Sequence, residues 1–387
     1  MGFGLVGPVL PYLVGRWVSD PSQLALTVSL LSVSYAGCAF IASPLLGALS
    51  DRYGRRPVLL FSLLGSAIGY ALFGIGGALW MLFLGRIMDG LTAGNFSAIF
   101  GMLIDSTAPE ERGKHFGWIG AAFGGGFIVG PAIGGLASKV SLETPFFIAA
   151  GLTLLNLLWG YFFVPESLKP QNRSLELQWA QLNPFTQIAG LFGITALRWL
   201  LVVGVLFMIP FAMMQTTLAV LLKDSLGWGV DQTSLVFIIV GISDIAVQGL
   251  LLALLLKTFG ERRVAIGALF IAVCGLVGMA LLPSIPNAVL VFSSVIAFAV
   301  GEGVFTATLG SLLSQSAGPT MQGRVQGGNQ ALQSLTQVGG PLLSGALYSR
   351  VSSGAPFWAS AGMVLLGAIT LLMGNAAPSP KPELLEG

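Results

Sequence analysis

The chain has 387 residues, of which 55% are apolar and 9% are charged, and its mean hydropathy is +0.86. Because a soluble domain carries about 25% charged residues, this composition excludes a soluble globular protein and indicates residence in a lipid bilayer. The formal net charge of +2 carries no signal of nucleic-acid binding, and we expect no nucleic-acid partner.

Long apolar runs with internal Gly and Pro predict membrane-spanning helices of about 20 residues, not barrel strands, in which apolar residues would alternate. The first run has no basic leader and no small-x-small cleavage site, so we interpret it as a span and not as a signal peptide. Because Met1 stands directly at its start, we expect a short N-terminal tail to be missing. The twelve candidate spans are residues 2–18, 27–49, 57–78, 80–104, 115–138, 145–164, 197–222, 232–256, 263–283, 286–312, 324–350 and 354–374.

The connection between the second and third spans reads Gly-Ala-Leu-Ser-Asp-Arg-Tyr-Gly-Arg-Arg. This tight basic turn resembles the signature loop of the major facilitator superfamily of secondary transporters. The matching positions are Gly47, Asp51, Arg52, Gly54, Arg55 and Arg56. The resemblance implies an all-α membrane protein with twelve transmembrane helices in two pseudo-symmetric six-helix bundles. It also implies that Asp51 lies near the start of the eleventh helix and helps to close the inner gate.

The fourth and fifth spans carry further strings. The fourth reads Gly-Arg-Ile-Met-Asp-Gly-Leu-Thr-Ala-Gly-Asn from Gly85 to Asn95 and is followed by Asp105. On the fifth, glycines at i, i+4 and i+8 leave one stripe without side chains, so a neighbouring backbone can approach closely. A proline within that stripe bends the helix. The positions of this second string are Gly126, Gly130, Pro131, Gly134 and Gly135.

Both strings resemble the tetracycline/proton and multidrug antiporters with twelve helices, and the glycine–proline string is the pattern of the proton-coupled exporters. In that family the arginine at the position of Arg86 is tied to proton transfer, and the carboxylate at Asp105 braces the basic loop. Tetracycline exporters carry Gly-Ala-Thr where this chain has Ala-Gly-Asn at residues 93–95, which argues against tetracycline itself as the substrate. The alternative interpretation of the glycine stripe is tight packing with no coupling role.

The chain contains two copies of one unit. An offset of 210 residues aligns Pro-x-x-x-Gly-Lys at 109–114 with Pro-x-x-x-Gly-Arg at 319–324. Such six-helix repeats imply a substrate path at their interface near the membrane midplane. The predicted divisions are an N-terminal bundle (1–164), a polar cytoplasmic linker (165–196), a C-terminal bundle (197–374) and a cytoplasmic tail (375–387).

The basic residues predict the orientation. With both termini on one face, that face holds thirteen of the 18 basic residues and the other face four, so the first is cytoplasmic by the positive-inside rule. The thirteen are Arg52, Arg55, Arg56, Arg112, Lys114, Lys169, Arg173, Arg198, Lys257, Arg262, Arg263, Arg324 and Lys381.

Four ionisable residues lie within the spans, where a charge costs about 2.5–3.5 kcal/mol and therefore suggests a function. Arg86 and Asp89 are three residues apart and can form an ion pair within one helix. Asp244 and Glu302 have no cation within a helical turn, and a carboxyl in a low-dielectric site favours its protonated form. In order, the candidates for proton coupling are Glu302, Asp244, Asp89 and Arg86; a substrate hydrogen bond and a structural role are the alternatives.

Neighbours of the acidic residues predict a cavity of aromatic rings and amides, which suits an amphiphilic, partly planar organic molecule. For a glutamine stripe on the eleventh span, at positions 326, 330, 333 and 337, we favour interhelical hydrogen bonding. The candidate cavity residues are Asn95, Phe207, Phe211, Gln215, Gln248, Phe298, Phe305 and Gln330.

We therefore predict a transporter that exports an amphiphilic molecule in exchange for protons by alternating access, as a monomer in the bacterial inner membrane. The alternative is a proton-coupled importer of a small nutrient, which would not be expected to carry the exporter string. A membrane enzyme would need a reactive cluster, and the lone His115 furnishes neither that nor a metal site. Without a Gly-x-x-x-x-Gly-Lys-Ser/Thr string, ATP is not the energy source, and we expect no cofactor.

Overall fold

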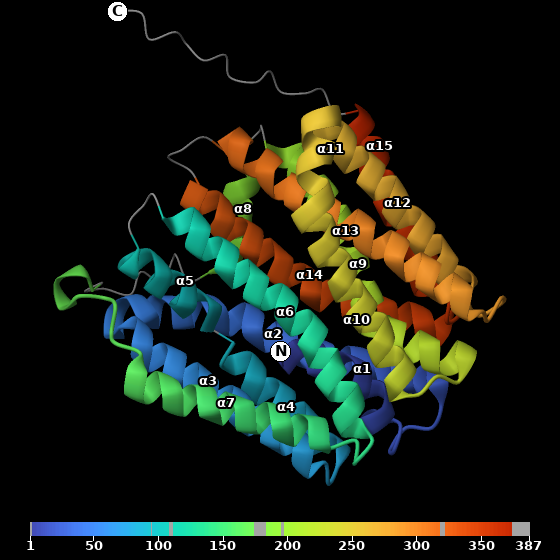
Figure 1. Cartoon of the computed structure of the whole chain (residues 1–387), viewed down its shortest axis with the longest axis horizontal. Helices are drawn as coiled ribbons and strands as arrows, with labels where there is room; N and C mark the ends of the chain where they lie inside the picture. The colour runs from blue at the N-terminus through green and yellow to red at the C-terminus, as the bar shows by residue number, and fades with distance from the viewer. Residues whose placement is uncertain are drawn as a thin grey trace, which may run out of the picture.

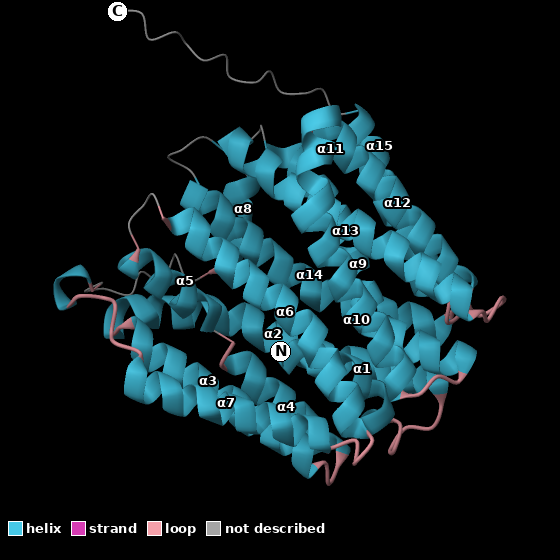
Figure 2. Cartoon of the chain, in the orientation of Figure 1, coloured by secondary structure: helices cyan, strands magenta, loops and turns pink. Residues whose placement is uncertain are grey.

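The computed structural model describes residues 2–93, 95–107, 111–173, 183–194, 197–317 and 322–373, and within them every regular element is helical (Figure 2). The first part of the chain forms α1 (Gly2–Val14), α2 (Pro21–Tyr53), α3 (Arg55–Ile75), α4 (Leu79–Leu91), α5 (Asn95–Ser106), α6 (Arg112–Ser138), α7 (Thr144–Phe163), the 3₁₀ helix η1 (Pro170–Asn172) and α8 (Pro184–Phe192). The remainder forms α9 (Arg198–Leu226), α10 (Val230–Ala246), the π-helix η4 (Val247–Leu251), α11 (Leu252–Phe259), α12 (Glu261–Leu281), α13 (Ala288–Ala317), α14 (Gln322–Arg350) and α15 (Ala355–Met373). Among the described residues, eight helices are long and apolar enough to cross a membrane by themselves.

The twelve predicted spans are all present, but two of them are interrupted. The fourth is divided into α4 and α5, and the eighth is formed by α10, η4 and α11. The first break begins at Thr92, whose side-chain hydroxyl lies within hydrogen-bond distance of the carbonyls of Met88 and Asp89, at 2.8 and 3.3 Å. Such side-chain bonds compete with the helical backbone ladder.

The packing of the helices is pseudo-symmetric (Figure 1). In the first half α1 packs on α6, α2 on α4 and α3 on α7; in the second half the equivalent pairs are α9 with α14, α10 with α13 and α12 with α15. The two halves meet where α2 packs against α14 and α6 against α10. This arrangement is the predicted all-α fold of two six-helix bundles.

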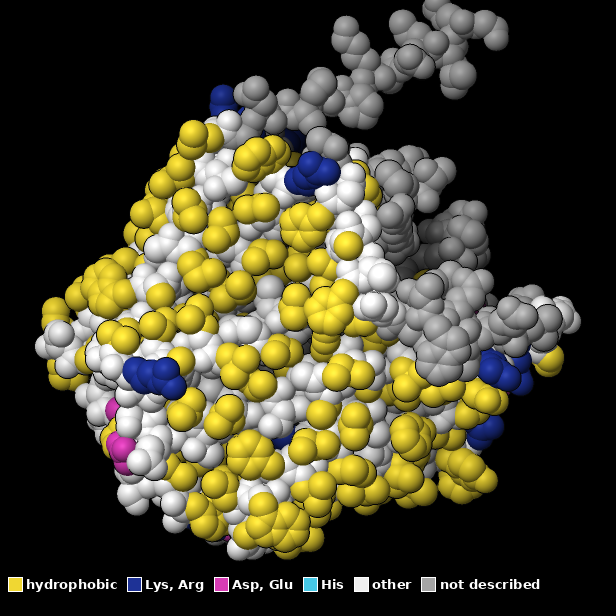
Figure 3. All heavy atoms as spheres, turned by 180° about the vertical axis from the view of Figure 1, so that it is seen from behind, with side chains coloured by type: hydrophobic (Ala, Val, Ile, Leu, Met, Phe, Trp, Pro, Cys, Tyr) yellow, Lys and Arg dark blue, Asp and Glu magenta, His cyan; other side chains and the backbone are white. Residues whose placement is uncertain are grey.

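Apolar side chains cover the outside of the molecule as well as filling its core. Figure 3 shows one face on which hydrophobic side chains predominate and charged ones are few. On α7 the exposed fractions of Trp159, Phe162 and Phe163 are 61, 71 and 70%. Exposed apolar surface on this scale fits a protein surrounded by lipid.

The turns between the helices lie at two ends of the bundle, which we call the basic end and the opposite end. The basic end holds the turn between α2 and α3, at Gly54, and the turn between α11 and α12, at Gly260. The opposite end holds the turn from α6 to α7 and the turn from α9 to α10.

The predicted polar linker, residues 165–196, contains the apolar helix α8, which we did not predict. The side chain of Asn183 caps it by accepting a hydrogen bond from the Phe185 N–H at 2.9 Å. The ring of Phe185 meets Phe40 of α2 edge-on at 5.3 Å, and Leu191 is fully buried. The division of the chain at this linker stays a prediction, and the predicted tail lies outside the described residues.

Candidate functional site

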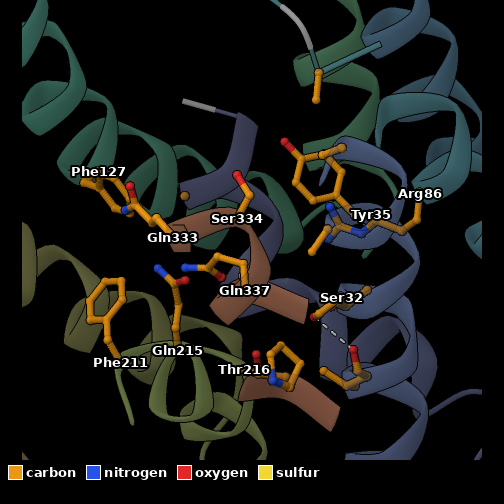
Figure 4. A pocket seen from close by; sticks show the side chains of 18 of the residues that line it. Ser32, Tyr35, Arg86, Phe127, Phe211, Gln215, Thr216, Gln333, Ser334 and Gln337 are labelled. Atoms are coloured by element: carbon orange, nitrogen blue, oxygen red, sulfur yellow. Dashed lines mark hydrogen bonds between the residues drawn. The ribbon is translucent and has the colours of Figure 1, made fainter. Parts of the chain in front are cut away.

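A cavity of about 500 Å³ lies between the two halves of the molecule (Figure 4). Both halves contribute to its wall, the first through α1, α2, α4 and α6 and the second through α9, α10, α13 and α14. Its side chains include Ser32, Tyr35, Arg86, Phe127, Phe211, Gln215, Thr216, Phe237, Glu302, Thr306, Gln330, Gln333, Ser334 and Gln337.

Amide side chains from two helices share one part of this wall. Gln330, Gln333 and Gln337 lie on one face of α14 because their spacing of three and four residues matches the helical repeat. Figure 4 shows Gln333 and Gln337 close to Gln215 of α9. These three α14 glutamines therefore border the cavity, and interhelical hydrogen bonding by the stripe stays a prediction.

The predicted aromatic residues divide into two groups. Phe211 lines the cavity, whereas Phe207, Phe298 and Phe305 are fully buried and form an aromatic cluster between α9 and α13. The rings of Phe207 and Phe305 are 4.6 Å apart, and those of Phe207 and Phe298 are 6.2 Å apart. These three predicted cavity residues belong to the core. Helical spacing predicts which residues share one face of a helix, but it does not predict which part of the protein packs against that face.

Arg86 lies at the cavity wall contributed by the first half. Its exposed fraction is 7%, and its guanidinium carbon lies 5.1 Å from the ring centre of Phe73 and 5.7 Å from that of Tyr35. The predicted ion pair with Asp89 is not formed, although both side chains are described. Asp89 points toward α3 instead, where its carboxylate accepts a hydrogen bond from the Ser66 hydroxyl at 2.6 Å.

Asp244 and Glu302 form a carboxyl pair. The two side chains lie next to each other, Asp244 on α10 and Glu302 on α13, and Glu302 also lines the cavity. We expected two separate groups, because 58 positions separate these residues in the chain. Two neighbouring ionised carboxylates repel each other and offer only acceptors, so this arrangement favours a proton on at least one of them.

The backbone around the pair is irregular. The π-helix η4 starts three residues after Asp244, and such π-bulges occur frequently at functional sites. A Cβ built on Gly303 would lie 3.3 Å from Asp244 Oδ1 and 3.7 Å from Gln248 Nε2. The predicted cavity residue Gln248 therefore lies beside the carboxyl pair and not among the residues that line the cavity.

The basic loop forms a network at the basic end. Arg55 contacts Asp51 and Asp105, and its Nε donates to Asp105 Oδ2 at 3.2 Å. Arg52 lies over the ring of Tyr53 at 5.4 Å. The network contains the expected brace from Asp105. Asp51 contacts Arg55. We expected Asp51 near the start of α14, but the side chains there lie outside the described residues.

Glu166 has a role in this loop that sequence reasoning missed. Its carboxylate accepts hydrogen bonds from the backbone N–H groups of Arg55 and Arg56, at 2.9 and 3.2 Å, and so caps the N-terminus of α3. Gly54 has φ = 110°, and a Cβ there would lie 2.2 Å from Glu166 Oε2. Only glycine meets both constraints, which gives Gly54 of the signature a physical reason.

The glycine stripe of α6 brings backbones close together. A Cβ on Gly4 of α1 would lie 3.3 Å from the Gly126 carbonyl and 3.2 Å from Pro131, and one on Gly134 would lie 3.1 Å from the Leu5 carbonyl. A Cβ on Gly135 would lie 3.0 Å from Ser234 of α10, in the other half. The stripe thus packs α6 against α1 and, at Gly135, against α10 of the second half. Gly130 lines a smaller cavity of about 210 Å³.

Hydrogen bonds join the halves at the opposite end. The Tyr12 hydroxyl of α1 donates to the Trp228 carbonyl at 2.7 Å and lies 2.7 Å from Thr233 Oγ1. Lys139 Nζ and Asp231 Oδ2 are 3.5 Å apart, also across the halves. The hydrogen bonds of Tyr12 hold the opposite end closed, whereas the exposed ion pair of Lys139 and Asp231 adds little to this closure.

Glu143 at the start of α7 lies at the same end. Burial alone would raise its pKa, but hydrogen bonds outweigh burial, chiefly those from the Arg16 guanidinium, so that its pKa falls below the ordinary value. Within the described residues, no group of three or more His, Cys, Asp or Glu side chains could hold a metal ion. The side chain of Asn95 lies outside the described residues.

Comparison with known proteins assigns this architecture to a protein family. The model of the Major Facilitator Superfamily matches residues 1–339. The class C tetracycline resistance protein of Escherichia coli is 35% identical over 353 residues, 91% of this chain and 87% of that protein. The quinolone resistance protein NorA of Staphylococcus aureus is 25% identical, over 96% of this chain and 92% of that protein.

Solved structures agree with the fold. The human organic anion transporter MFSD10 has a TM-score of 0.71 and 25% identity, covering 96% of this chain and 95% of that one. The nucleoside transporter NupG has a TM-score of 0.78 at 15% identity, with 96% of each chain covered, which shows the fold alone. From its matched family model, its relatives and its two pseudo-symmetric helix bundles, this chain belongs to the Major Facilitator Superfamily of transporters.

Proposed function

We propose that this transporter exports amphiphilic small organic molecules in exchange for protons. The relatives named for resistance to tetracycline and to quinolones support export of such molecules. The observation that carries the proton part is the contact between Asp244 and Glu302, because Glu302 also forms part of the cavity wall. A single group can then respond both to a proton and to the cargo.

The proposed exchange follows from the hydrogen-bonding capacity of the pair. While Asp244 and Glu302 are in contact they share at least one proton, since two ionised carboxylates have no donor between them. Cargo that donates a hydrogen bond or brings a positive charge to Glu302 competes for that carboxyl and favours release of the proton. A proton that returns from the other side of the membrane restores the pair and displaces the cargo.

Alternating access requires the two ends of the bundle to open in turn. With the basic residues concentrated at the basic end, we infer that this end faces the cytoplasm. The chain divides into two rocking units at residues 165–196 in this proposal. In the present conformation the hydrogen bonds of Tyr12 close the opposite, external end, so the conformation corresponds to one that receives cargo from inside.

The experiment is a comparison of uphill and downhill transport in proteoliposomes with a panel of dyes and antibiotics. Replacing Glu302 by Gln, or Asp244 by Asn, should abolish transport driven by a pH gradient while cargo binding and downhill exchange persist. Asp231→Asn is the matched control, because it removes an exposed carboxylate from a surface ion pair of small energetic value. Gradient-driven transport at the wild-type rate in both variants would overturn the assignment, and gradient-driven uptake in the wild type would favour the nutrient importer.

A further inference from the structure

The guanidinium of Arg86 is a buried cation at the cavity wall with no hydrogen-bond acceptor from the described protein. No side chain or carbonyl of the described residues accepts a hydrogen bond from it, and its Nε is completely buried without a partner. A guanidinium carries five N–H donors and stays charged at all accessible pH values. Buried polar groups are nearly always paired, so an arginine left in this state requires an explanation.

Neighbouring groups fix the position of this cation without satisfying it. The rings of Phe73 and Tyr35 lie within 6 Å of its guanidinium carbon, close enough for cation–π attraction. Asp89 attracts it through space, but the Asp89 carboxylate is turned to the Ser66 hydroxyl on α3. Figure 4 shows Arg86 beside Tyr35, across the cavity from Gln215 and Gln333.

We infer that Arg86 is the subsite for an acidic oxygen group of the cargo, a carboxylate or an ionised enol or phenol. This inference rests on the proposed function and narrows it to planar amphiphiles that carry such a group. The planar fork of arginine matches two oxygen atoms at once and gives short, charge-assisted hydrogen bonds. A purely cationic amphiphile would bring a second positive charge toward an unpaired one and is disfavoured. The amides of α14 then contact the body of the cargo from the other side.

The test is equilibrium binding of a matched pair of dyes to the full chain in detergent, with no pH gradient. Rhodamine B carries a free carboxylate, and its ethyl ester has the same ring system without that charge. By fluorescence polarisation, the wild type should bind the acid more tightly than the ester. Arg86→Gln should weaken binding of the acid about tenfold or more, the loss expected for charge-assisted hydrogen bonds, and leave binding of the ester unchanged.

Retained ester binding shows that the variant is folded. Arg86→Lys, which keeps the charge but not the fork, should fall between the wild type and Arg86→Gln. The preference of the wild type for acid over ester decides the question even where both variants fail to fold. The inference is overturned if the wild type binds the two dyes equally or binds neither. It is also overturned if a folded variant loses affinity for both dyes equally. Proton-driven export of cationic dyes alongside such a result would leave the proposed function intact.

Discussion

Removing the Tyr12 hydroxyl should open the external end of the transporter. In the present conformation this hydroxyl makes two contacts of 2.7 Å across the halves, one to the Trp228 carbonyl and one to Thr233 Oγ1. A hydrogen bond contributes about 0.5–1.5 kcal/mol net, so Tyr12→Phe should destabilise the closed conformation by about 1–3 kcal/mol. A difference of that size changes the ratio of the two conformations about 5- to 150-fold. Thr233→Val removes one contact only and should have a smaller effect of the same sign.

Pulsed electron–electron resonance between two spin labels measures this shift. Suitable label positions are Val140 in the first half and Val289 in the second, which are 81 and 75% exposed at the opposite end. The native cysteines, Cys38 and Cys274, are first replaced by serine. The wild type should give a distance distribution dominated by the short, closed population, and Tyr12→Phe should enlarge the longer one.

Tyr53→Phe is the control, since it removes a hydroxyl from an exposed tyrosine at the basic end. A distance distribution in Tyr12→Phe that matches the wild type would refute the reasoning, because the hydroxyl would then contribute nothing to closure. An equal shift in Tyr53→Phe would show that the effect is not specific to the closed end.

Two further predictions concern stability. Because the pKa of Glu143 is lowered, its contact with Arg16 stabilises the fold fully above pH 4.5, the ordinary pKa, and this stabilisation is lost as the pH falls through the lowered pKa. The difference in melting temperature between the wild type and Glu143→Gln should therefore become smaller as the pH falls below 4.5. A Cβ on Gly275 would lie 2.6 Å from the backbone of α13, so Gly275→Ala should cost about 1–3 kcal/mol by overpacking. Gly267→Ala on the same helix meets no atom within 4 Å and should melt no lower than the wild type.

Much of the fold could be predicted because membranes restrict the choice of structure. Every backbone polar group must be satisfied within a span, so an apolar run of sufficient length predicts a helix without knowledge of its neighbours. The basic loop was recognised from its resemblance to the family signature, which also supplied Asp105, 50 residues beyond Arg55, as its brace. The capping of α3 by Glu166 was not predicted, because Glu166 lies 110 residues beyond Arg56 and nothing in the local sequence marks it as a partner.

The candidate site was harder to predict, because it depends on which face of each helix meets which neighbour. Phe207 and Phe211 are one turn apart on α9, yet the first is core and the second lines the cavity. The same limit hid the contact between Asp244 and Glu302, which requires the packing of α10 on α13. Spacing along a helix identified the residues that share a face but not the surface opposite.

The two helix interruptions give a physical link between the fold and the candidate site. Thr92 ends α4 three residues after Asp89, and η4 begins three residues after Asp244. Irregular backbone at membrane depth is tolerated only where protein or a cavity, and not lipid, surrounds it. The breaks therefore lie next to ionisable groups, and both the irregular backbone and these groups must be kept away from lipid. Sequence hydropathy averages over both breaks, which is why continuous spans were expected at 80–104 and 232–256 although charged residues within them were recognised. Glu302 lies within the continuous helix α13, so an ionisable residue in a span does not by itself predict a helix break.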